Sequence, residues 1–471
     1  MAETKSTCCY CGVGCGVIIE HEAGRVVGVK GDPDHPANFG RLCTKGATLH
    51  FSAAPETLAV RALYPELRAN RNEARQRVSW DSALDTAVEK FAAIIQEHGP
   101  DAVAVYGAGQ LLTEDYYVFN KLMKGLIGSN NLDTNSRLCM SSAVAGYKLS
   151  LGADAPPCSY ADIADTQALF ITGSNTAFAH PITFRRVEDA RKANPEMKLV
   201  VIDPRRTDTA EAADLHLALM PGTDIALYNA MLHVMLWEGW IDRDYIEAHT
   251  EGFDALKKVV REYSPAMAAS ICGLDKKAIE QAAQIFATSK ATMSMYCQGL
   301  NQFSFGTHNN SALINLHLAT GQIGKPGAGP FSLTGQPNAM GGREVGGLAN
   351  LLSAHRDMAN PAHRAEVAAL WGIDSVPDKP GKSAVELFQA LKSGEVKAVW
   401  IACTNPAQSM PDQTLIDEAL KSAEFVIVQE AFGHTETCAY ADLLLPATTW
   451  GEKDGTVTNS ERAITRVRGA V

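Results

Sequence analysis

Four cysteines close to the start of the chain limit what this region can fold around. Cys8, Cys11, Cys15 and Cys43 follow the spacing C-x2-C-x3-C-x27-C. Three thiolates on one short loop, closed by a distant fourth, can hold the corners of a 4Fe–4S cubane. A zinc site and free thiols are the alternatives, but structural zinc usually takes paired C-x2-C knuckles, which this spacing lacks. The spacing predicts a 4Fe–4S cluster.

Length and charge exclude several classes of protein. A chain of 471 residues is longer than one core usually serves, so about two to four domains are expected. The 42 basic and 53 acidic residues give a net charge of −11, which argues against a general nucleic-acid binder. No stretch approaches the roughly eighteen apolar residues of a membrane span, so no membrane insertion is expected.

The N-terminus and the clustered thiols predict a location. Neither an apolar export signal nor a twin-arginine motif precedes the cysteines. If Met1 is the natural start, we expect a cytoplasmic protein. A reducing cytoplasm disfavours disulfides, so thiols clustered there indicate metal binding.

Short apolar runs alternate with helical patterns along most of the chain. Each run ends in a polar turn; the runs are 101–109, 168–175, 197–207, 397–406 and 424–432. Helical spacing of apolar residues predicts helices within 79–99, 223–239 and 276–289, the first capped by Ser79 or Asp81. Alternation of this kind is typical of parallel sheets covered by helices on both faces, with ligands at the carboxyl ends of the strands. The glycine-rich segment 321–347 is expected to be a functional loop without helix or strand.

A resemblance to a known family becomes specific when further stretches are added to CCYCGVGCG (8–16) and GRLCTKG (40–46). These stretches, in chain order, are TGSN (172–175), IDPRRT (202–207), MPGTDIAL (220–227), TGQIGKPGAGPFSLTGQPNAMG (320–341) and EKDGTVTNSER (452–462). Together they resemble the molybdopterin oxidoreductases that carry bis-molybdopterin guanine dinucleotide. The resemblance covers essentially the whole chain.

The resemblance implies an α/β fold in three parts. A small β-rich iron–sulfur domain over 1–55 is followed by two α/β domains with mainly parallel sheets and Rossmann-like dinucleotide sites. The expected domains are 131–344, with the molybdenum and pterin motifs, and a discontinuous domain made of 56–130 and 345–471. Members of the family continue with a C-terminal β-barrel-like domain, for which the chain, ending at Val471, has no residues.

The resemblance also assigns roles around the cluster. Lys45 is expected to lie between the cluster and a pterin. Cys9 stands where relatives commonly have proline, and pairing it with Cys11 would place two ligands one residue apart. We therefore expect Cys9 to be a spectator.

Cys139, within TNSRLCMSSAVAGYK (134–148), stands where the family places its molybdenum ligand. An inert buried cysteine is the alternative, although the polar residues around it disfavour a plain core position. Met140 resembles the nitrate reductases of the family, since formate dehydrogenases have histidine there. The loop 332–347 also resembles the nitrate reductases, and it implies that Arg343 lies near the substrate. A salt bridge from Arg343 to Glu344 is the alternative.

Further residues are expected to bind the pterin dinucleotides through matching motifs. These are Lys45, Gln110, Asn135, Gly173, Ser174, Asn175, Asp203, Arg205, Gly222, Thr223, Asp224, Gln298, Gln302, Asn405, Glu430 and Lys453. The turn 173–175 would offer backbone N–H groups to a pyrophosphate. Any single member of the second half, from Gln298 onward, could instead be an ordinary structural residue.

The function that the resemblance implies is reduction of nitrate to nitrite by a cytoplasmic, assimilatory-type catalytic subunit. Its expected cofactors are a 4Fe–4S cluster, molybdenum and bis-molybdopterin guanine dinucleotide. Electrons are expected from a partner protein, either ferredoxin, flavodoxin or an NADH-dependent reductase subunit. A formate dehydrogenase subunit and a non-catalytic electron-relay relative are the alternatives; the latter would lack Cys139.

Overall fold

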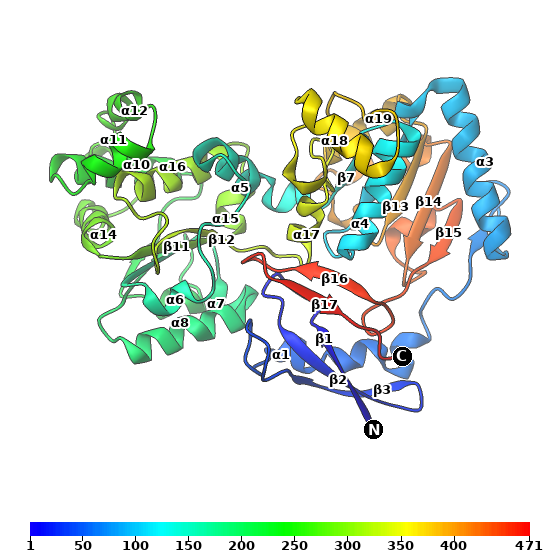
Figure 1. Cartoon of the computed structure of the whole chain (residues 1–471), viewed down its shortest axis with the longest axis horizontal. Coiled ribbons are helices and arrows are strands. Elements are labelled where there is room, and N and C mark those ends of the chain that lie inside the picture. The colour runs from blue at the N-terminus through cyan, green and yellow to red at the C-terminus, as the bar shows by residue number, and fades with distance from the viewer.

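A computed structural model describes residues 1–471 as three β-sheets with their helices and one additional hairpin. Figure 1 shows the five-stranded and seven-stranded sheets on opposite sides of the molecule, with the N-terminal sheet below and between them. No helix of the chain has both the length and the apolar character needed to cross a bilayer.

The N-terminal unit is an antiparallel sheet in the order β1-β2-β3 followed by short helices. Its elements are β1 (Ala2–Thr7), β2 (Gly16–Glu22), β3 (Arg25–Gly31), α1 (Thr44–Ala47), η1 (Leu49–Ala53) and α2 (Pro55–Leu58). The hairpin of β16 (Gly455–Thr458) and β17 (Ile464–Val467) packs on β1 from the other end of the chain. Several hydrogen bonds join the two segments here; for example, Arg468 N–H donates to Ser6 Oγ (3.0 Å) and Trp450 Nε1–H to Thr7 O (3.3 Å).

The seven-stranded sheet has the order β5-β4-β15-β14-β13-β6-β7. Its strands are β4 (Glu66–Leu67), β5 (Gln76–Arg77), β6 (Val103–Gly107), β7 (Leu132–Thr134), β13 (Ala398–Ala402), β14 (Phe425–Glu430) and β15 (Leu443–Pro446). The five strands from β15 to β7 are parallel, and β4 and β5 extend the sheet antiparallel. The associated helices are α3 (Trp80–His98), η2 (Pro100–Ala102), α4 (Thr113–Asn120), η3 (Lys121–Ile127), α17 (Ala339–Glu344), η4 (Ser353–His355), α18 (Pro361–Trp371), α19 (Ala384–Ser393), α20 (Pro406–Ser409), α21 (Gln413–Ser422) and η5 (Glu436–Tyr440).

The five-stranded sheet is wholly parallel, in the order β10-β9-β8-β11-β12. Its strands are β8 (Ala168–Thr172), β9 (Lys198–Ile202), β10 (Leu215–Leu217), β11 (Thr292–Tyr296) and β12 (Gly329–Ser332). Its helices are α5 (Ser136–Leu151), α6 (Asp162–Asp165), α7 (Thr176–Ala179), α8 (Pro181–Ala193), α9 (Asp208–Glu211), α10 (Asp224–Trp237), α11 (Arg243–His249), α12 (Phe253–Val260), α13 (Pro265–Cys272), α14 (Lys276–Thr288), α15 (Gln298–Asn301) and α16 (Gly306–Ala319).

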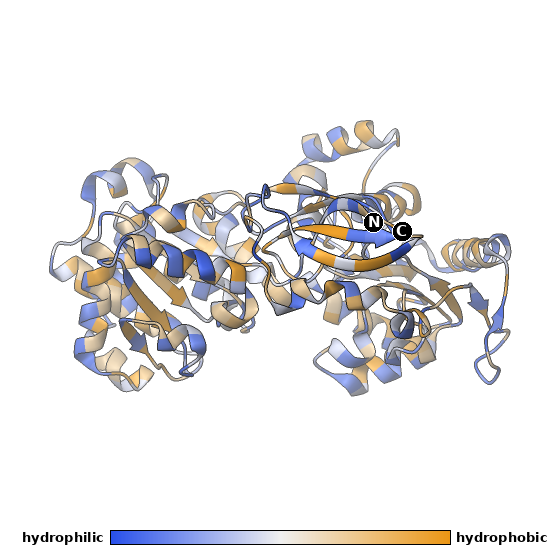
Figure 2. Ribbon diagram, turned by 90° about the horizontal axis from the view of Figure 1, so that it is seen from below, coloured by the Kyte–Doolittle hydropathy of each residue, from blue (hydrophilic) through white to orange (hydrophobic).

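The central strands of both large sheets pack apolar side chains on both faces, since successive strand residues point to opposite sides and each side meets a hydrophobic core. In β8, Phe170 packs in the core that contains α10, α14 and α16, whereas Leu169 and Ile171 face α8. The second of these cores also contains Cys8 and Cys15, so the N-terminal unit and the five-stranded sheet share one apolar core. Figure 2 shows the hydrophobic strands of this sheet between helices with hydrophilic outer sides.

The expected strands and helices are present, and Ser79 rather than Asp81 caps α3, since its Oγ accepts the Ser82 N–H at 3.1 Å. The expectation that 321–347 lacks helix and strand is wrong. This segment contains β12 and α17, which are four and six residues long and therefore too short to show a periodicity.

The seven-stranded sheet differs from the expected domain boundaries at one place. Strand β7 pairs with β6 in this sheet, although 131–344 was expected to belong to the other domain. The hairpin at 455–467 joins two parts of the molecule: β17 packs on β1 of the N-terminal unit, and β16 packs on α4 and α17 of the seven-stranded domain.

Candidate functional site

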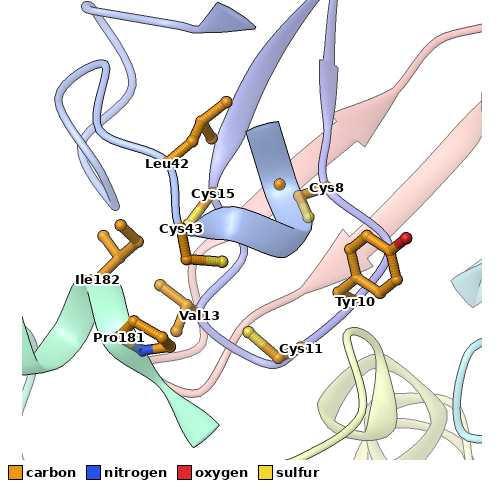
Figure 3. A pocket seen from close by; sticks show the side chains of 10 residues that line it. Cys8, Tyr10, Cys11, Val13, Cys15, Leu42, Cys43, Pro181 and Ile182 are labelled. Atoms are coloured by element: carbon orange, nitrogen blue, oxygen red, sulfur yellow. The ribbon is translucent and has the colours of Figure 1, made fainter. Parts of the chain in front are cut away.

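Cys8, Cys11, Cys15 and Cys43 line one pocket of the N-terminal unit, and their side chains turn toward a common space (Figure 3). The loop between β1 and β2 is closed by a hydrogen bond from Cys8 N–H to Cys15 O (2.9 Å), and Cys43 directly precedes α1. Pro181 and Ile182 of α8 close the pocket from the five-stranded domain. The structure thus brings together the four thiols that the sequence spacing selected.

Burial affects the protonation of the thiols in this pocket. Burial raises the pKa of Cys8, Cys11 and Cys15, so these thiols hold their protons unless positive charge enters the pocket. Iron supplies such charge, because it binds the thiolate.

Cys9 does not line the pocket that the four cluster cysteines share. It lines a neighbouring cleft of about 310 Å³ beside Gln110, Cys403, Glu430 and Lys453, and Cys8 lines both spaces. Burial raises the pKa of Cys9 to about 11, so it is a neutral thiol at physiological pH. That Cys9 binds no iron stays a prediction.

Lys45 reaches from the cluster toward the five-stranded sheet. It lies in α1, two residues after Cys43, and its Nζ is 5.8 Å from the centroid of the Phe178 ring in α7. Helix α7 directly follows the turn 173–175, for which pyrophosphate binding is predicted. Lys45 therefore lies between the cluster and a predicted cofactor turn.

Cys139 is buried in the first turns of α5 beside amide groups. Gln298 Nε2 donates to Cys139 Sγ at 2.7 Å, and a Cβ atom on Gly335 would lie 3.8 Å from the sulfur. Burial raises the pKa of Cys139, and the nearby polar groups of Gln298, Gln336 and Gly335 and the charge of Arg343 lower it in part. Gln298 was expected to contact a pterin, and the structure places it on the predicted molybdenum ligand.

Met140 interrupts the helix that carries Cys139. Its backbone (φ −139°, ψ 16°) is not helical, so α5 is kinked one residue after the thiol. The side chain is 1% exposed, packs with Cys139 and Ala339, and accepts a hydrogen bond from Thr334 Oγ1 at 2.8 Å. The kink and these contacts fix the direction of Cys139.

Arg343 is 3% exposed and lies near Cys139, whose thiol responds to its charge. Its Nη1 pairs with Asp154 Oδ1 at 3.1 Å, while Nε is buried without a partner. The alternative pairing of Arg343 with Glu344 is wrong, because adjacent residues of a helix point in different directions. Glu344 bonds His355 and Arg462 instead.

The Thr334–Gly335 segment connects the cluster loop to Cys139. Gly12 N–H donates to Gly335 O at 3.2 Å, and the carbonyl of Gly12 accepts from Ser460 Oγ at 3.0 Å. A Cβ atom on Gly12 would overlap both Thr334 Cγ2 and the Thr334 carbonyl oxygen. Gly335 also lies beside Cys139, since a Cβ atom built on it would be 3.8 Å from the sulfur, so one short segment adjoins both predicted redox centres.

We expect Gly12→Ala to disturb this connection. The added methyl must displace Thr334, and overpacking of this kind typically costs about 1–3 kcal/mol. Measured against wild type, the variant should show a lower thermal unfolding midpoint and fewer iron atoms per chain. Gly24→Ala is the matched control: its φ of +75° disfavours alanine, but the new Cβ meets no atom. Full iron content in Gly12→Ala would contradict the expectation.

One group of predicted dinucleotide contacts gathers at the carboxyl edge of the five-stranded sheet. Gly173, at the end of β8 with φ +57°, accepts the N–H of Gly299 at 2.9 Å, and a Cβ on either would overlap the other. Asp203 follows β9, and Asp224 begins α10. Burial, helped by the charge of Asp203, raises the pKa of Asp224 to about 6. Neighbouring carboxylates of this kind suit the N–H groups of guanine.

The remaining predicted contacts of this sheet lie close to that edge. Ser174 Oγ bonds Thr176 Oγ1 at 2.9 Å, and Asn175 Oδ1 accepts from Thr209 at 2.8 Å. Arg205 is exposed beyond β9, and Gly222 and Thr223 directly precede α10. The exposed Gln302 donates to Leu138 O at 2.8 Å, beside the helix that carries Cys139.

A second group lies at the carboxyl edge of the seven-stranded sheet. Gln110, Asn135, Asn405 and Glu430 follow or end β6, β7, β13 and β14. Asn135 joins two of these turns, since Oδ1 accepts the Gly109 N–H at 2.8 Å and Nδ2 approaches Thr404 Oγ1 at 3.4 Å. Lys453 lines the same cleft as Gln110 and Glu430. The residues predicted from motifs thus lie on two facing sets of strand ends, and their roles remain predictions.

Sequence reasoning missed three residues around Cys139. Thr334 and Gln336 both lie within TGQPNAMG (334–341), a stretch that supported the family resemblance without giving either side chain a role. Asp154, the partner of Arg343, belongs to no motif, and only its near-complete burial as a charged residue marks it (1% exposed).

Comparison with known proteins agrees with this arrangement. Residues 61–471 match the family described as Molybdopterin oxidoreductase, and residues 1–54 match the Molybdopterin oxidoreductase Fe4S4 domain. The chain belongs to the molybdopterin oxidoreductase family. This member is 47% identical over 98% of its length to a nitrate reductase of Synechocystis sp. and 48% identical over 99% to one of Klebsiella oxytoca. It is also 34% identical, over its full length, to formate dehydrogenase H of Escherichia coli.

This molybdopterin oxidoreductase chain spans 65% and 52% of the two nitrate reductases, so between half and two thirds of their length. Acetylene hydratase from Pelobacter acetylenicus has the same fold, with a TM-score of 0.80 at 24% identity; the match covers 99% of this chain and 66% of that one.

The residues present fit the cofactors of the family, a 4Fe–4S cluster and molybdenum held by molybdopterin. Four thiols share one pocket, and a fifth, Cys139, accepts an amide hydrogen bond. The carbonyl oxygens of Gln298 and Gln336 are buried beside it without hydrogen-bond partners. Buried polar atoms without partners are costly, so a bound group that donates hydrogen bonds would stabilise them.

Proposed function

We propose that this chain is the catalytic part of a molybdenum nitrate reductase, in which nitrate, two electrons and two protons give nitrite and water. The observation that carries the proposal is the buried guanidinium of Arg343, whose charge acts on the Cys139 thiol. A guanidinium recognises a planar anion through paired hydrogen bonds. Relatives named nitrate reductase, at 47% and 48% identity, support this substrate.

The chain supplies the ligands of both centres. Cys8, Cys11, Cys15 and Cys43 would hold the cluster, Cys139 the molybdenum, and the two sets of strand ends the halves of a bis-molybdopterin guanine dinucleotide. When bound, the molybdenum group accepts an oxygen atom from the substrate and provides two electrons.

The protein's own side chains bind and orient the anion. Arg343 Nε, which is buried without a partner, can donate to nitrate, and Asp154 balances the guanidinium charge while no anion is bound. Met140 and Ala339 cover Cys139 with apolar surface, which excludes water. Exclusion of water strengthens the ionic contact between Arg343 and the bound anion. In this role Arg343 and Met140 set the choice of substrate.

The partners and location form part of the same proposal. Electrons would reach the cluster from ferredoxin, flavodoxin or an NADH-dependent reductase subunit, and the role would be assimilatory in the cytoplasm. A relative from Desulfovibrio desulfuricans is named periplasmic nitrate reductase, at 42% identity. Fractionation of the source cells tests the location directly: activity in a periplasmic extract would overturn the cytoplasmic assignment.

The enzymatic proposal is tested by assaying the cofactor-loaded protein with both candidate substrates. We expect nitrite from nitrate with reduced viologen and no viologen reduction with formate. Formate oxidation without nitrite formation would favour a formate dehydrogenase instead. The variant Met140→His supplies the residue found in those enzymes, and we expect it to lower the rate of nitrate reduction, measured as kcat/KM.

A further inference from the structure

A line of charged side chains runs from Arg343 to the protein surface. Arg343 Nη1 bonds Asp154 Oδ1 at 3.1 Å, and His355 Nδ1 faces Asp154 Oδ2 at 3.7 Å. His355 Nε2 bonds Glu344 Oε2 at 2.7 Å, and Arg462 holds Glu344 through two hydrogen bonds of 2.8 and 2.9 Å. Side-chain exposure rises along this line from 1% for Asp154 to 22% for His355 and 38% for Arg462.

Backbone strain is concentrated in this line. Ala354 (φ 57°), His355 (φ 56°) and Arg462 (φ 68°) are three of the six non-glycine residues with positive φ in the chain. Such conformations cost about 1–3 kcal/mol each and persist only where the surroundings impose them. Lys124 imposes part of this geometry, since its buried Nζ binds the carbonyls of residues 346, 348 and 351 between α17 and η4. His355 is thus held in place at a cost in backbone energy.

The proton positions on His355 follow from its neighbours. Burial alone would raise the pKa of Glu344, but hydrogen bonds from His355 and Arg462 lower it to about 2. Glu344 is therefore an ionised acceptor, and the ring nitrogen that bonds it, Nε2, carries a proton. In the neutral ring Nδ1 then has only a lone pair, facing the carboxylate oxygen of Asp154.

This arrangement explains a gap between two buried polar atoms. His355 Nδ1 and Asp154 Oδ2 are both buried and have no hydrogen-bond partner. Their 3.7 Å separation exceeds a hydrogen bond by less than 1 Å, as expected for two acceptors that face each other without a proton between them. One added proton would turn the gap into a charge-assisted hydrogen bond.

We propose that His355 and Asp154 form a proton-binding pair that controls the availability of Arg343 for the anion. This inference rests on the proposed function. A proton taken from solvent forms an N–H···O bond between His355 Nδ1 and Asp154 Oδ2, and its return to solvent breaks that bond. Arg343 itself stays protonated throughout.

Protonation also changes the ion pair of Arg343. A proton shared by His355 and Asp154 reduces the negative charge that Arg343 senses, so the guanidinium is released toward an incoming anion. The charged groups that face the pair are Glu344 behind His355, Arg462 behind Glu344, and Arg343 beside Asp154. His355 acts through Asp154 and Arg343 and is therefore a positioning residue.

The kinetic test compares His355→Gln with wild type in the loaded enzyme, with kcat and KM for nitrate measured across the pH range. Wild-type KM for nitrate should rise with pH as the pair loses its proton and Asp154 holds Arg343 more tightly. In His355→Gln we expect this dependence of KM on pH to be absent. His363→Gln is the matched control, since His363 bonds only the exposed Asp357 N–H. An unchanged pH profile in His355→Gln would overturn the proposal.

A second measurement does not depend on turnover. NMR of the cofactor-free protein with labelled histidine rings follows His355 through a pH titration, and His355→Gln assigns its signal. Asp154→Asn removes the carboxylate, so we expect the midpoint of His355 to shift to lower pH; an unshifted midpoint overturns the proton-binding pair. If the loaded enzyme reduces no nitrate, the proposed function fails, while the NMR result still decides whether the two groups share a proton.

Discussion

Cys139→Ala should abolish nitrate reduction while leaving the iron–sulfur centre intact. The thiol is buried, receives an amide hydrogen bond, and is aimed by the kink at Met140, but it lies outside the cluster pocket. Loss of groups that merely orient a metal ligand typically costs about 10–100-fold in activity or metal affinity. We therefore expect turnover to fall more than about 100-fold, together with bound molybdenum, while the EPR signal of the reduced cluster persists.

The matched control for this experiment is Cys158→Ala. Cys158 is equally buried, at 7% exposure, but donates only to Pro330 O at 3.4 Å. Both variants remove one buried sulfur, so a general effect of the cavity would appear in both. Retention of molybdenum and turnover in Cys139→Ala would remove this residue from the metal site.

Cys11→Ser and Cys9→Ser should have opposite effects on iron. Cys11 turns into the pocket shared with Cys8, Cys15 and Cys43 (Figure 3). Cys9 does not line that pocket and lines the neighbouring cleft instead. Wild type and Cys9→Ser should bind about four iron atoms per chain, and Cys11→Ser clearly fewer, because a 4Fe–4S cluster needs its four thiolates. The measurements are iron analysis and the EPR spectrum of the reduced protein.

Comparing these two variants is informative, because Cys9 and Cys11 lie only two residues apart in the same loop. Serine in place of either has nearly the same volume, so packing changes little. Iron loss in Cys9→Ser with full iron in Cys11→Ser would mean that the loop presents the other set of thiols to the cluster.

The parts of this molecule that sequence could predict are those encoded locally. The spacing of the four cysteines fixes which thiols share a loop, and the apolar runs ending in polar turns place β6, β8, β9, β13 and β14. Parallel strands bring their carboxyl ends to one edge, so turns as distant as 173–175 and 203–205 could be expected to meet. Cys139 was reached only through the family resemblance, since one cysteine in a helix has no local pattern.

The parts that could not be predicted depend on contacts between distant segments. Asp154, Arg343 and His355 come from three separate segments, and no periodicity relates them. Strand β12 was missed because four residues paired along one edge have no amphipathic pattern. The mistaken partner of Arg343 shows the same limit: proximity in sequence favoured Glu344, whereas tertiary packing selected Asp154.

The β16–β17 hairpin has a consequence for the order in which this protein is assembled. The cluster loop depends on the far end of the chain, because Ser460 bonds the Gly12 carbonyl, Asn459 reaches Val13 O at 3.3 Å, and Trp450 bonds Thr7 O. Translation at about 5–20 residues per second separates these segments by roughly 20–90 s. During this time the cluster loop of the nascent chain lacks these contacts. Completion of the cluster pocket, and with it stable iron loading, therefore follows synthesis of residues 450–460.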